Sequence, residues 1–248
     1  MGTSIRKLFK KILPGPVHRF LKLDSFKRHL APLSPRQCNV CGFHGVFKPF
    51  GHPPRIDTKC PECKSLDRHR LLMLAHERGK FKTDHGPEDF VLHFAAEPVL
   101  EKIFRKTWSN YKTADLFFSA DLKLNLEEID LEDESTSLII ANHVLEHVDD
   151  RKTAREFHRI LKPGGTLACM VPIIEGWEKT YENPEVSSEE DRWLHFGQGD
   201  HVRYFGRDFR DRIASGGLTL TTEFTAEGKD VIKYGLCRGE KVFIFQKQ

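Results

Sequence analysis

The sequence predicts an α/β protein with a seven-stranded, mostly parallel sheet, helices on both faces of the sheet, and a small cysteine-rich module in front of it. Two observations carry this prediction. Strand-like and helix-like segments alternate over residues 88–248, and two closely spaced cysteine pairs precede them. Such alternation is typical of a parallel sheet whose strands are connected by helices. A length of 248 residues suits one large domain and one small module.

The predicted sheet begins near residue 90. Short apolar runs predict strands at Phe90–Ala95, Tyr111–Leu116, Lys123–Leu126, Leu138–Asn142, Thr166–Pro172, Leu218–Thr225 and Lys241–Gln246. Helical signals fall at Pro98–Thr107, His143–Leu161 and Phe209–Ala214. Residues 174–205 interrupt the alternation, and we expect them to form an insertion on the substrate side. We therefore divide the chain into an N-terminal segment (1–34), a cysteine-rich module with a connecting helix (35–80) and the domain that contains the sheet (81–248).

The first segment, residues 1–34, is predicted to be basic and amphipathic. Its apolar side chains recur at helical spacing, at Ile5, Leu8, Phe9 and Ile12. Lys and Arg outnumber Asp and Glu in residues 1–80, and the reverse holds in residues 81–248. A basic front end suits nucleic acid, or a membrane surface contacted through residues 1–30. The alternatives are a helix docked on the protein's own body, and charge that serves solubility.

The lengths of the apolar runs also bear on where in the cell the protein is expected. They are all shorter than the ~18–20 residues of a membrane-spanning helix, and the first residues lack the apolar stretch and cleavage site of a signal peptide. We therefore expect a cytoplasmic protein, with peripheral attachment at the inner membrane face as the alternative. The pattern leaves the oligomeric state open.

The four clustered cysteines predict a structural metal. They form two Cys-x-x-Cys pairs separated by a short stretch, at Cys38, Cys41, Cys60 and Cys63. This spacing is typical of tetrahedral zinc, and four thiolates leave no open position for catalysis. An iron–sulfur centre is the alternative metal group. The resulting zinc ribbon could staple a segment too small for its own core, or it could help to bind RNA. The basic run that follows, 67–70, either faces an anionic substrate or is a solvated helix start.

Polar residues follow the predicted strands in an order that suits a nucleotide-like ligand. The first strand runs into Ala95, Ala96 and Glu97, and Pro98 then suits the first position of a helix. Asp115 ends the next strand, where a carboxylate can accept hydrogen bonds from ribose hydroxyls. Asn125 and Leu126 come after the third strand, and Asn142 ends the fourth.

Two stretches resemble a known family. The segment LIIANHVLEHVDDRKTAREFHRILKPGGTL, residues 138–167, resembles the fourth-strand to fifth-strand region of class I, type 11-like methyltransferases, which are Rossmann-like enzymes that use S-adenosylmethionine (SAM). The segment VLHFAAEP, residues 91–98, is similar to the first motif of one subgroup in which a four-cysteine element also precedes the domain. His93 stands where the family usually has an acidic residue, and Ala95 where it has a glycine.

The resemblance implies a set of SAM-binding residues. Ala95, Ala96 and Glu97 would line the methionine end of SAM, Asp115 would bind the ribose, and Asn142 would lie beneath the sulfonium. The full implied set is His93, Phe94, Ala95, Ala96, Glu97, Asp115, Leu116, Asn125, Leu126 and Asn142.

A histidine-rich cluster follows the fourth strand. His143, Glu146 and His147 are spaced to share one face of a helix, and His201 is a further candidate. One interpretation is an inverted zincin motif of a metalloprotease. A second is a site for another divalent metal, since the position resembles the Glu-x-x-Glu-His helix of ubiquinone-pathway O-methyltransferases and small-RNA 2′-O-methyltransferases. A third is general-base catalysis by His147 or His201, oriented by Glu146. The fourth is a purely structural role.

These residues leave three functions open. The first is O-methylation of a small-molecule or glycan-type acceptor, because histidines suit an oxygen nucleophile better than a carbon one. The second is methylation of rRNA or tRNA, guided by the zinc ribbon and the basic N-terminus. The third is a binding module that has lost catalysis. Arg203, Arg207 and Lys179 are candidates to bind a carboxylate or phosphate of the acceptor, or are surface charges.

Overall fold

The computed structural model describes residues 35–51, 54–81 and 88–248. The segment 1–34, with its expected amphipathic character and membrane contact, lies outside the described residues. Within the described part, the main sheet has six strands in the order β11-β12-β8-β7-β5-β6. They are β5 (Val91–Phe94), β6 (Tyr111–Ala114), β7 (Thr136–Asn142), β8 (Leu161–Met170), β11 (Leu218–Phe224) and β12 (Val242–Lys247).

Most of this sheet is parallel, which confirms the predicted α/β fold. Strand β5 pairs in parallel with β6 and β7, and β7 pairs in parallel with β8. Strand β12 runs antiparallel to both of its neighbours, β8 and β11. The carboxyl ends of β5, β6, β7 and β8 therefore meet at one edge, and this is the edge at which open α/β sheets bind ligands.

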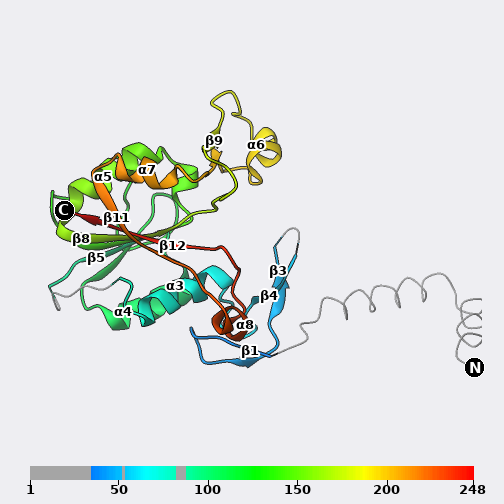
Figure 1. The fold of residues 1–248 in the computed structure, drawn as a ribbon. Helices are drawn as coiled ribbons and strands as arrows, with labels where there is room; N and C mark the ends of the chain where they lie inside the picture. Colours follow the sequence, from blue (N-terminus) through cyan, green and yellow to red (C-terminus); the bar gives the residue numbers. More distant parts are fainter. Residues whose placement is uncertain (1–34, 52–53, 82–87) are drawn as a thin grey trace, which may run out of the picture.

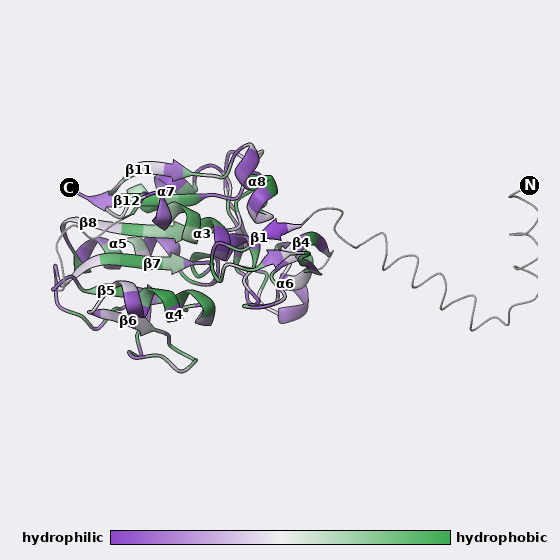
Figure 2. Ribbon diagram, turned by 90° about the horizontal axis from the view of Figure 1, so that it is seen from below, coloured by the Kyte–Doolittle hydropathy of each residue, from purple (hydrophilic) through white to green (hydrophobic). Residues whose placement is uncertain are grey.

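Helices cover both faces of the sheet (Figure 1). Helices α5 (Asp150–Ile160) and α7 (Phe209–Ala214) lie on one face, and α3 (Asp67–Glu77) and α4 (Pro98–Thr107) on the other. Strand β7 is buried at all of its positions, as expected for a strand covered on both sides. The hydrophobic residues accordingly gather on the central strands (Figure 2). None of the helices in the described part is long and apolar enough to cross a bilayer.

The expected strand at residues 123–126 is absent, so the sheet has one strand fewer than predicted. Leu122 makes a single parallel bridge to Ala114 at the sheet edge. The carboxylate of Asp121 accepts the backbone N–H of Thr113 at 2.8 Å, a donor that a longer ladder would need. A side chain thus replaces the neighbouring strand, and the segment continues as an irregular loop.

The expected helix 143–161 begins later than predicted. His143 has a left-handed backbone with φ of 52°, which breaks helical continuity after β7. A short 3-10 helix, η1 (Leu145–His147), follows, and α5 starts only at Asp150. The carboxylate of Asp149 caps α5 by accepting the N–H groups of Arg151 and Lys152. His143, Glu146 and His147 therefore do not share one helical face.

Two small antiparallel pairs form the four-cysteine ribbon, defined here as residues 35–66. They are β1 (Arg36–Gln37) with β2 (His44–Gly45), and β3 (Lys48–Phe50) with β4 (Arg55–Lys59). The ribbon lies beside α8 (Lys229–Tyr234), the short helix before β12 (Figure 1). Residues 174–205 carry β9 (Tyr181–Glu182), α6 (Glu189–Phe196) and β10 (Arg203–Tyr204), and β9 and α6 project beyond the sheet.

Arg70 on α3 joins the ribbon to the rest of the molecule. Its side chain is fully buried, and the guanidinium donates to the carbonyl oxygens of Ser65 and Thr58 in the ribbon, each at 2.9 Å. It also donates to the carbonyl oxygens of Tyr234 at 2.7 Å and Gly235 at 2.8 Å. Each nitrogen of the Arg70 guanidinium thus donates to at least one carbonyl oxygen, as a buried charge requires. The interpretation that the 67–70 run faces a substrate is therefore wrong for Arg70.

Candidate functional site

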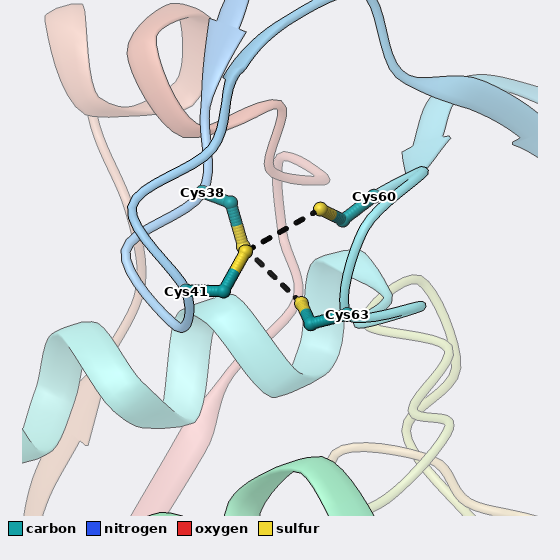
Figure 3. Close-up of side chains that lie close together, drawn as sticks. All are labelled: Cys38, Cys41, Cys60 and Cys63. Atoms are coloured by element: carbon teal, nitrogen blue, oxygen red, sulfur yellow. Dashed lines mark hydrogen bonds between the residues drawn. The ribbon is translucent and has the colours of Figure 1, made fainter.

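The four cysteines of the ribbon point toward one another (Figure 3). The Sγ atoms of Cys38 and Cys63 are 3.6 Å apart, and those of Cys41 and Cys60 are 3.7 Å apart. Tetrahedral zinc with Zn–S bonds of about 2.3 Å places its sulfur ligands about 3.8 Å apart. The donor set and its spacing therefore fit zinc, and the spacing shows that the two pairs converge as predicted.

Both cysteine pairs are held by the same kind of turn. The N–H of Gly42 donates to the carbonyl of Cys38, and the N–H of Lys64 donates to the carbonyl of Cys60. Gly42 and Lys64 are left-handed, with φ of 81° and 66°, and each follows the second cysteine of its pair. A left-handed lysine is strained, so formation of the second turn is a cost that metal binding would offset.

The loop after β5 supplies a carboxylate at the sheet edge. Ala95 adopts a left-handed φ of 46°, a conformation that glycine adopts more readily than residues with a side chain. Glu97 then occupies the N-cap position of α4, without a hydrogen bond from its side chain to the helix. Its carboxylate lies 3.4 Å from His93 and 3.5 Å from His69. Burial alone would raise the pKa of Glu97, but these imidazoles hold it below its usual value, so the carboxylate stays charged.

His93 lies behind this loop. Its side chain is fully buried, and its Nδ1 is 2.7 Å from the hydroxyl of Tyr111. Phe94 is also buried and packs on Phe157 in the core. Of the expected residues at this loop, Ala95, Ala96 and Glu97 remain accessible, while His93 and Phe94 support them from beneath.

The ends of β6 and the following loop place the next expected residues at the same edge. One carboxylate oxygen of Asp115 accepts the N–H groups of Phe117 and Phe118, at 2.7 and 2.8 Å, and so fixes the turn. The exposed Leu116 comes directly after it. Asn125 closes a similar turn by accepting the N–H of Glu127 at 3.0 Å, and Leu126 packs partly into the core.

Asn142, at the end of β7, is buried without hydrogen-bond partners. It is 5% exposed, and among the described residues neither its amide nitrogen nor its amide oxygen has a partner. Buried polar groups are normally satisfied, and an exception commonly marks a ligand or water site. Asn142 lies in register between β5 and β8, at the edge that carries Ala95 and Asp115.

His143 turns away from the other histidines. Its Nδ1 is 3.3 Å from Glu146 and its Nε2 is 3.5 Å from Glu240, in the loop before β12. Burial disfavours the imidazolium, but these two carboxylates outweigh it and raise the pKa of His143 to about 9. His143 is therefore a cation at neutral pH that neutralises Glu146.

Glu146, His147 and His201 come together instead. Their potential ligand atoms all lie within 4.8 Å of one another, and the two imidazole rings are 4.7 Å apart. Glu146 is 1% exposed, and its second carboxylate oxygen and Nδ1 of His201 are buried without partners. Two unpaired buried atoms facing one cluster mark it as a candidate site for a ligand or water.

Neighbouring groups fix the histidine tautomers. Nδ1 of His147 lies 3.1 Å from the carbonyl oxygen of Asp200, which can only accept. His147 therefore carries its proton on Nδ1 and presents a lone pair on Nε2. The side-chain amide of Gln198 lies 2.8 Å from Nε2 of His201, and burial lowers the pKa of His201, which keeps it neutral. Asp200 and Gln198 were missed by the sequence analysis, although both lie within three residues of His201.

The arginine expected to bind the acceptor has a structural role. Arg203 is buried and donates to the carbonyl of Leu145, and it pairs with Asp150 and Glu182. It thereby ties the insertion to η1 and α5. The expectation that Arg203 binds an acceptor is therefore not supported by its position, and Arg207 is exposed beside Glu178.

With this geometry in place, comparison with known proteins decides the family. The family model described as "Methyltransferase domain" matches residues 99–169, which run from α4 to β8. The chain contains a class I methyltransferase domain. This confirms the resemblance seen in the strand-to-helix motifs. The histidines after β7 are accordingly part of a methyltransferase domain, and the protease interpretation is wrong.

Relatives agree with this assignment at low identity. The demethylmenaquinone methyltransferase of Listeria welshimeri is 32% identical over 100 residues, 39% of this chain and 41% of that protein. The chain thus spans about two fifths of the length of the curated relatives it matches.

A solved structure shares the fold. The YcgJ protein of Bacillus subtilis is 14% identical and superimposes over 73% of this chain and 99% of its own, with a TM-score of 0.50. A SAM-dependent methyltransferase of Mesorhizobium loti is 11% identical, with a TM-score of 0.47 over 66% of this chain and 94% of its own.

Proposed function

We propose that the protein transfers the methyl group of SAM to an oxygen atom of a small-molecule or glycan-type acceptor. The observation that carries the proposal is the buried side-chain amide of Asn142, which has no hydrogen-bond partner. It lies at the edge of the sheet where Glu97 begins α4 and Asp115 follows β6. A nucleoside sulfonium laid across this edge would satisfy Asn142.

The residues at this edge fit the parts of SAM. Asp115 uses one carboxylate oxygen for its turn, so the other is available to the ribose hydroxyls. The charged Glu97 suits the amino group of the methionine moiety. Leu116, Asn125 and Leu126 would border the adenine. SAM supplies the methyl group when bound, and these side chains orient it.

An oxygen acceptor is favoured by the cluster of Glu146, His147 and His201. The lone pair on Nε2 of His147 can take the proton of an acceptor hydroxyl as the oxygen attacks the methyl group. The buried carboxylate of Glu146 would stabilise the imidazolium that forms. Orienting the hydroxyl in line with the methyl group lowers the barrier further.

The same three side chains fit a divalent cation. Two histidines and one carboxylate are donors that zinc, iron and manganese accept, and the unpaired atoms of Glu146 and His201 face the cluster. Nδ1 of His201 would bind the cation only with its proton on Nε2, which requires the side-chain amide of Gln198 to present its oxygen to Nε2. A bound cation would lower the pKa of the acceptor hydroxyl. Of the four residues expected from the sequence, His201 remains in this set as the further candidate, and His143 lies apart beside Glu240. The structural zinc of the ribbon is proposed separately, on the four converging thiols.

Calorimetry with S-adenosylhomocysteine (SAH) tests the cofactor, and tritiated-methyl transfer to glycan, small-molecule and RNA fractions tests the acceptor class. The proposal requires SAH binding and label in a non-RNA fraction, and hydriodic acid should release that label as volatile methyl iodide, as it does from an O-methyl ether and not from a C-methyl product. Absence of SAH binding by a folded chain would contradict it. Elemental analysis after mild chelation separates the two proposed roles of the cluster, a general base and a cation site. If the protein remains active when its only metal is the zinc of the ribbon, the result supports His147 as the base.

RNA methylation remains the second candidate because of one groove. A cavity of about 900 Å³ between the ribbon and α4 is lined by Lys64, Arg68, Lys102 and Lys106, with Glu97 as its acidic residue. RNA held there by phosphate contacts would dissociate steeply as salt rises from 50 to 200 mM, because counterions are released on binding. Filter binding of total tRNA and rRNA at these two salt concentrations tests this.

A further inference from the structure

A second cavity opens beside His143, and it bears on the acceptor of the proposed methyltransferase. Its volume is about 460 Å³, and it lies at the carboxyl ends of β7 and β8, where His143 and residues 171–173 form one wall. The opposite wall comes from Arg55 and Arg68 on the ribbon side and from residues 237–240 before β12. His143 of this wall lies 3.3 Å from Glu146, and this contact links the cavity to the cluster that would handle the acceptor.

The carboxylates of this cavity already have cationic partners. Both oxygens of Asp67, at its edge, accept from Arg55. Glu175 pairs with Arg210 at 2.8 Å and with Lys241 at 2.7 Å. Glu240 faces His143 at 3.5 Å. The negative charges of the lining are thus neutralised by groups next to them.

Two guanidinium groups of the lining have no such partner. Among the described residues, no carboxylate forms an ion pair with Arg68 or Arg238. Nε of Arg68 is buried and lacks any hydrogen-bond partner. Arg68 lies in the first turn of α3, shortly after the turn formed by the second cysteine pair. The ribbon therefore fixes its position. A buried guanidinium nitrogen without an acceptor is costly unless a ligand supplies one.

A cation site is the competing interpretation of the same wall. Asp67, Cys237 and Glu240 offer atoms within 4.8 Å of one another. Asp67 is fully engaged by Arg55, however, and a metal would have to displace that guanidinium. Two further arginines beside the site would also repel a cation. The charges of this cavity favour an anion.

We propose that Arg68 and Arg238 bind an anionic group, a carboxylate or phosphate, of the methyl acceptor. This rests on the proposed function, and it narrows the acceptor to an anionic molecule whose reacting hydroxyl lies toward His147. Guanidinium groups suit these anions because their fork geometry matches two oxygens at once. The apolar side chains of Val171, Pro172 and Ile173 would cover the rest of the acceptor.

The test is calorimetric titration of inorganic pyrophosphate into the full chain, with and without saturating SAH. Arg68→Gln and Arg238→Gln should each weaken pyrophosphate binding roughly tenfold or more, the loss expected for one charged hydrogen-bonding partner. Arg155→Gln is the matched control, because Arg155 is exposed on α5 and lines neither cavity described here. Melting curves show whether each variant is folded, and Arg68→Lys serves if Arg68→Gln is not.

Saturating SAH separates the acceptor from the cofactor, whose methionine moiety also carries a carboxylate. Pyrophosphate binding that persists in the SAH complex and is lost in both variants supports the proposal. Pyrophosphate binding abolished by SAH assigns the two arginines to the cofactor and overturns it, as does binding that neither variant changes. If SAH itself does not bind, the proposed function fails, while titration without SAH still tests the anion site.

Discussion

The guanidinium of Arg70 donates a hydrogen bond of 2.8 Å to the carbonyl oxygen of Gly235, across 165 positions of the chain. The same group holds two carbonyl oxygens of the four-cysteine ribbon. One buried side chain therefore fixes the ribbon against the loop that leads to Arg238 and Glu240. This relationship favours the ribbon as a wall of the active site over the ribbon as a detached RNA-binding module.

Replacing Arg70 should destabilise the whole protein. Arg70→Met removes the cation and its hydrogen bonds to the carbonyl oxygens of Ser65, Thr58, Tyr234 and Gly235, so we expect a loss of about 3 kcal/mol or more in the free energy of unfolding. Urea unfolding followed by circular dichroism measures it. Arg151→Met, on the exposed start of α5, is the control and should change little. An Arg70→Met protein as stable as wild type would refute the anchoring role.

Zinc should be bound by the ribbon and needed for its structure. Cys60→Ser removes one of four converging thiols, and because metal binding and folding of such a segment are coupled, it should lose zinc and lower the melting temperature. Elemental analysis gives the zinc content per chain. Cys237→Ser is the matched control, since Cys237 lies outside the four-thiol cluster, and it should keep its zinc. Zinc retained at the wild-type level in Cys60→Ser would count against the site.

The sheet and its binding edge could be predicted because their signals are local. The buried run of β7 is continuous in the sequence, and parallel strands bring Asp115 and Asn142 to one edge wherever the loops lead. The missing strand could not be foreseen, since it depends on the Asp121 carboxylate replacing a backbone partner of Thr113.

The residues of the histidine cluster were predicted from the sequence, but their arrangement was not. Spacing of three and four residues suggested one helical face for His143 and His147, whereas the left-handed backbone at His143 directs it to Glu240 instead. Periodicity cannot detect a single residue that leaves the helical region. Likewise, the acceptors of Arg70 at Tyr234 and Gly235 are too distant in sequence for any local pattern to connect them.

Acid should weaken the contact between α7 and β11 over a defined range. The guanidinium of Arg210 and the ammonium of Lys241 lower the pKa of Glu223 to about 2. Because the folded pKa is below the unfolded one, this carboxylate stabilises the protein fully above about pH 4.5, and the contribution fades as pH falls toward 2. The free-energy difference between wild type and Glu223→Gln, about 1–2 kcal/mol at neutral pH for a partly exposed group, should shrink over that range.

Denaturant unfolding of both proteins at a series of pH values measures this difference. Carboxylates that share no partner with Glu223 titrate equally in both proteins, so their effects cancel. Glu175 also pairs with Arg210 and Lys241, so the comparison is made in a Glu175→Gln background. Glu185→Gln, in an exposed loop, is the control and should show no such trend. A wild-type advantage that stays constant down to pH 2.5 would contradict the assignment.

Asp115 should be needed for cofactor binding but not for folding. Asp115→Asn keeps the amide oxygen that closes the turn at Phe117 and Phe118, and it removes the charge and the second acceptor offered to the ribose. We expect SAH affinity to fall roughly tenfold or more, in line with the loss of charged hydrogen bonds. Calorimetry with SAH measures it, and Asp130→Asn, an exposed residue of the following loop, is the control. Unchanged affinity would remove Asp115 from the cofactor site.

His147 should contribute to methyl transfer and not to cofactor binding. His147→Gln removes the Nε2 lone pair that the Asp200 carbonyl sets up, so the transfer rate should fall roughly 10²–10⁴-fold, the range for a lost general base, while SAH affinity stays within about twofold of wild type. Single-turnover transfer of tritiated methyl to the active fraction gives the rate, and calorimetry gives the affinity. His44→Gln is the control because His44 is exposed on the ribbon, away from the cluster. If the rate of His147→Gln rises again with pH as hydroxide replaces the base, the lost group was the proton acceptor. Equal loss of SAH affinity would instead assign His147 to the cofactor site and leave the acceptor hydroxyl without an identified base.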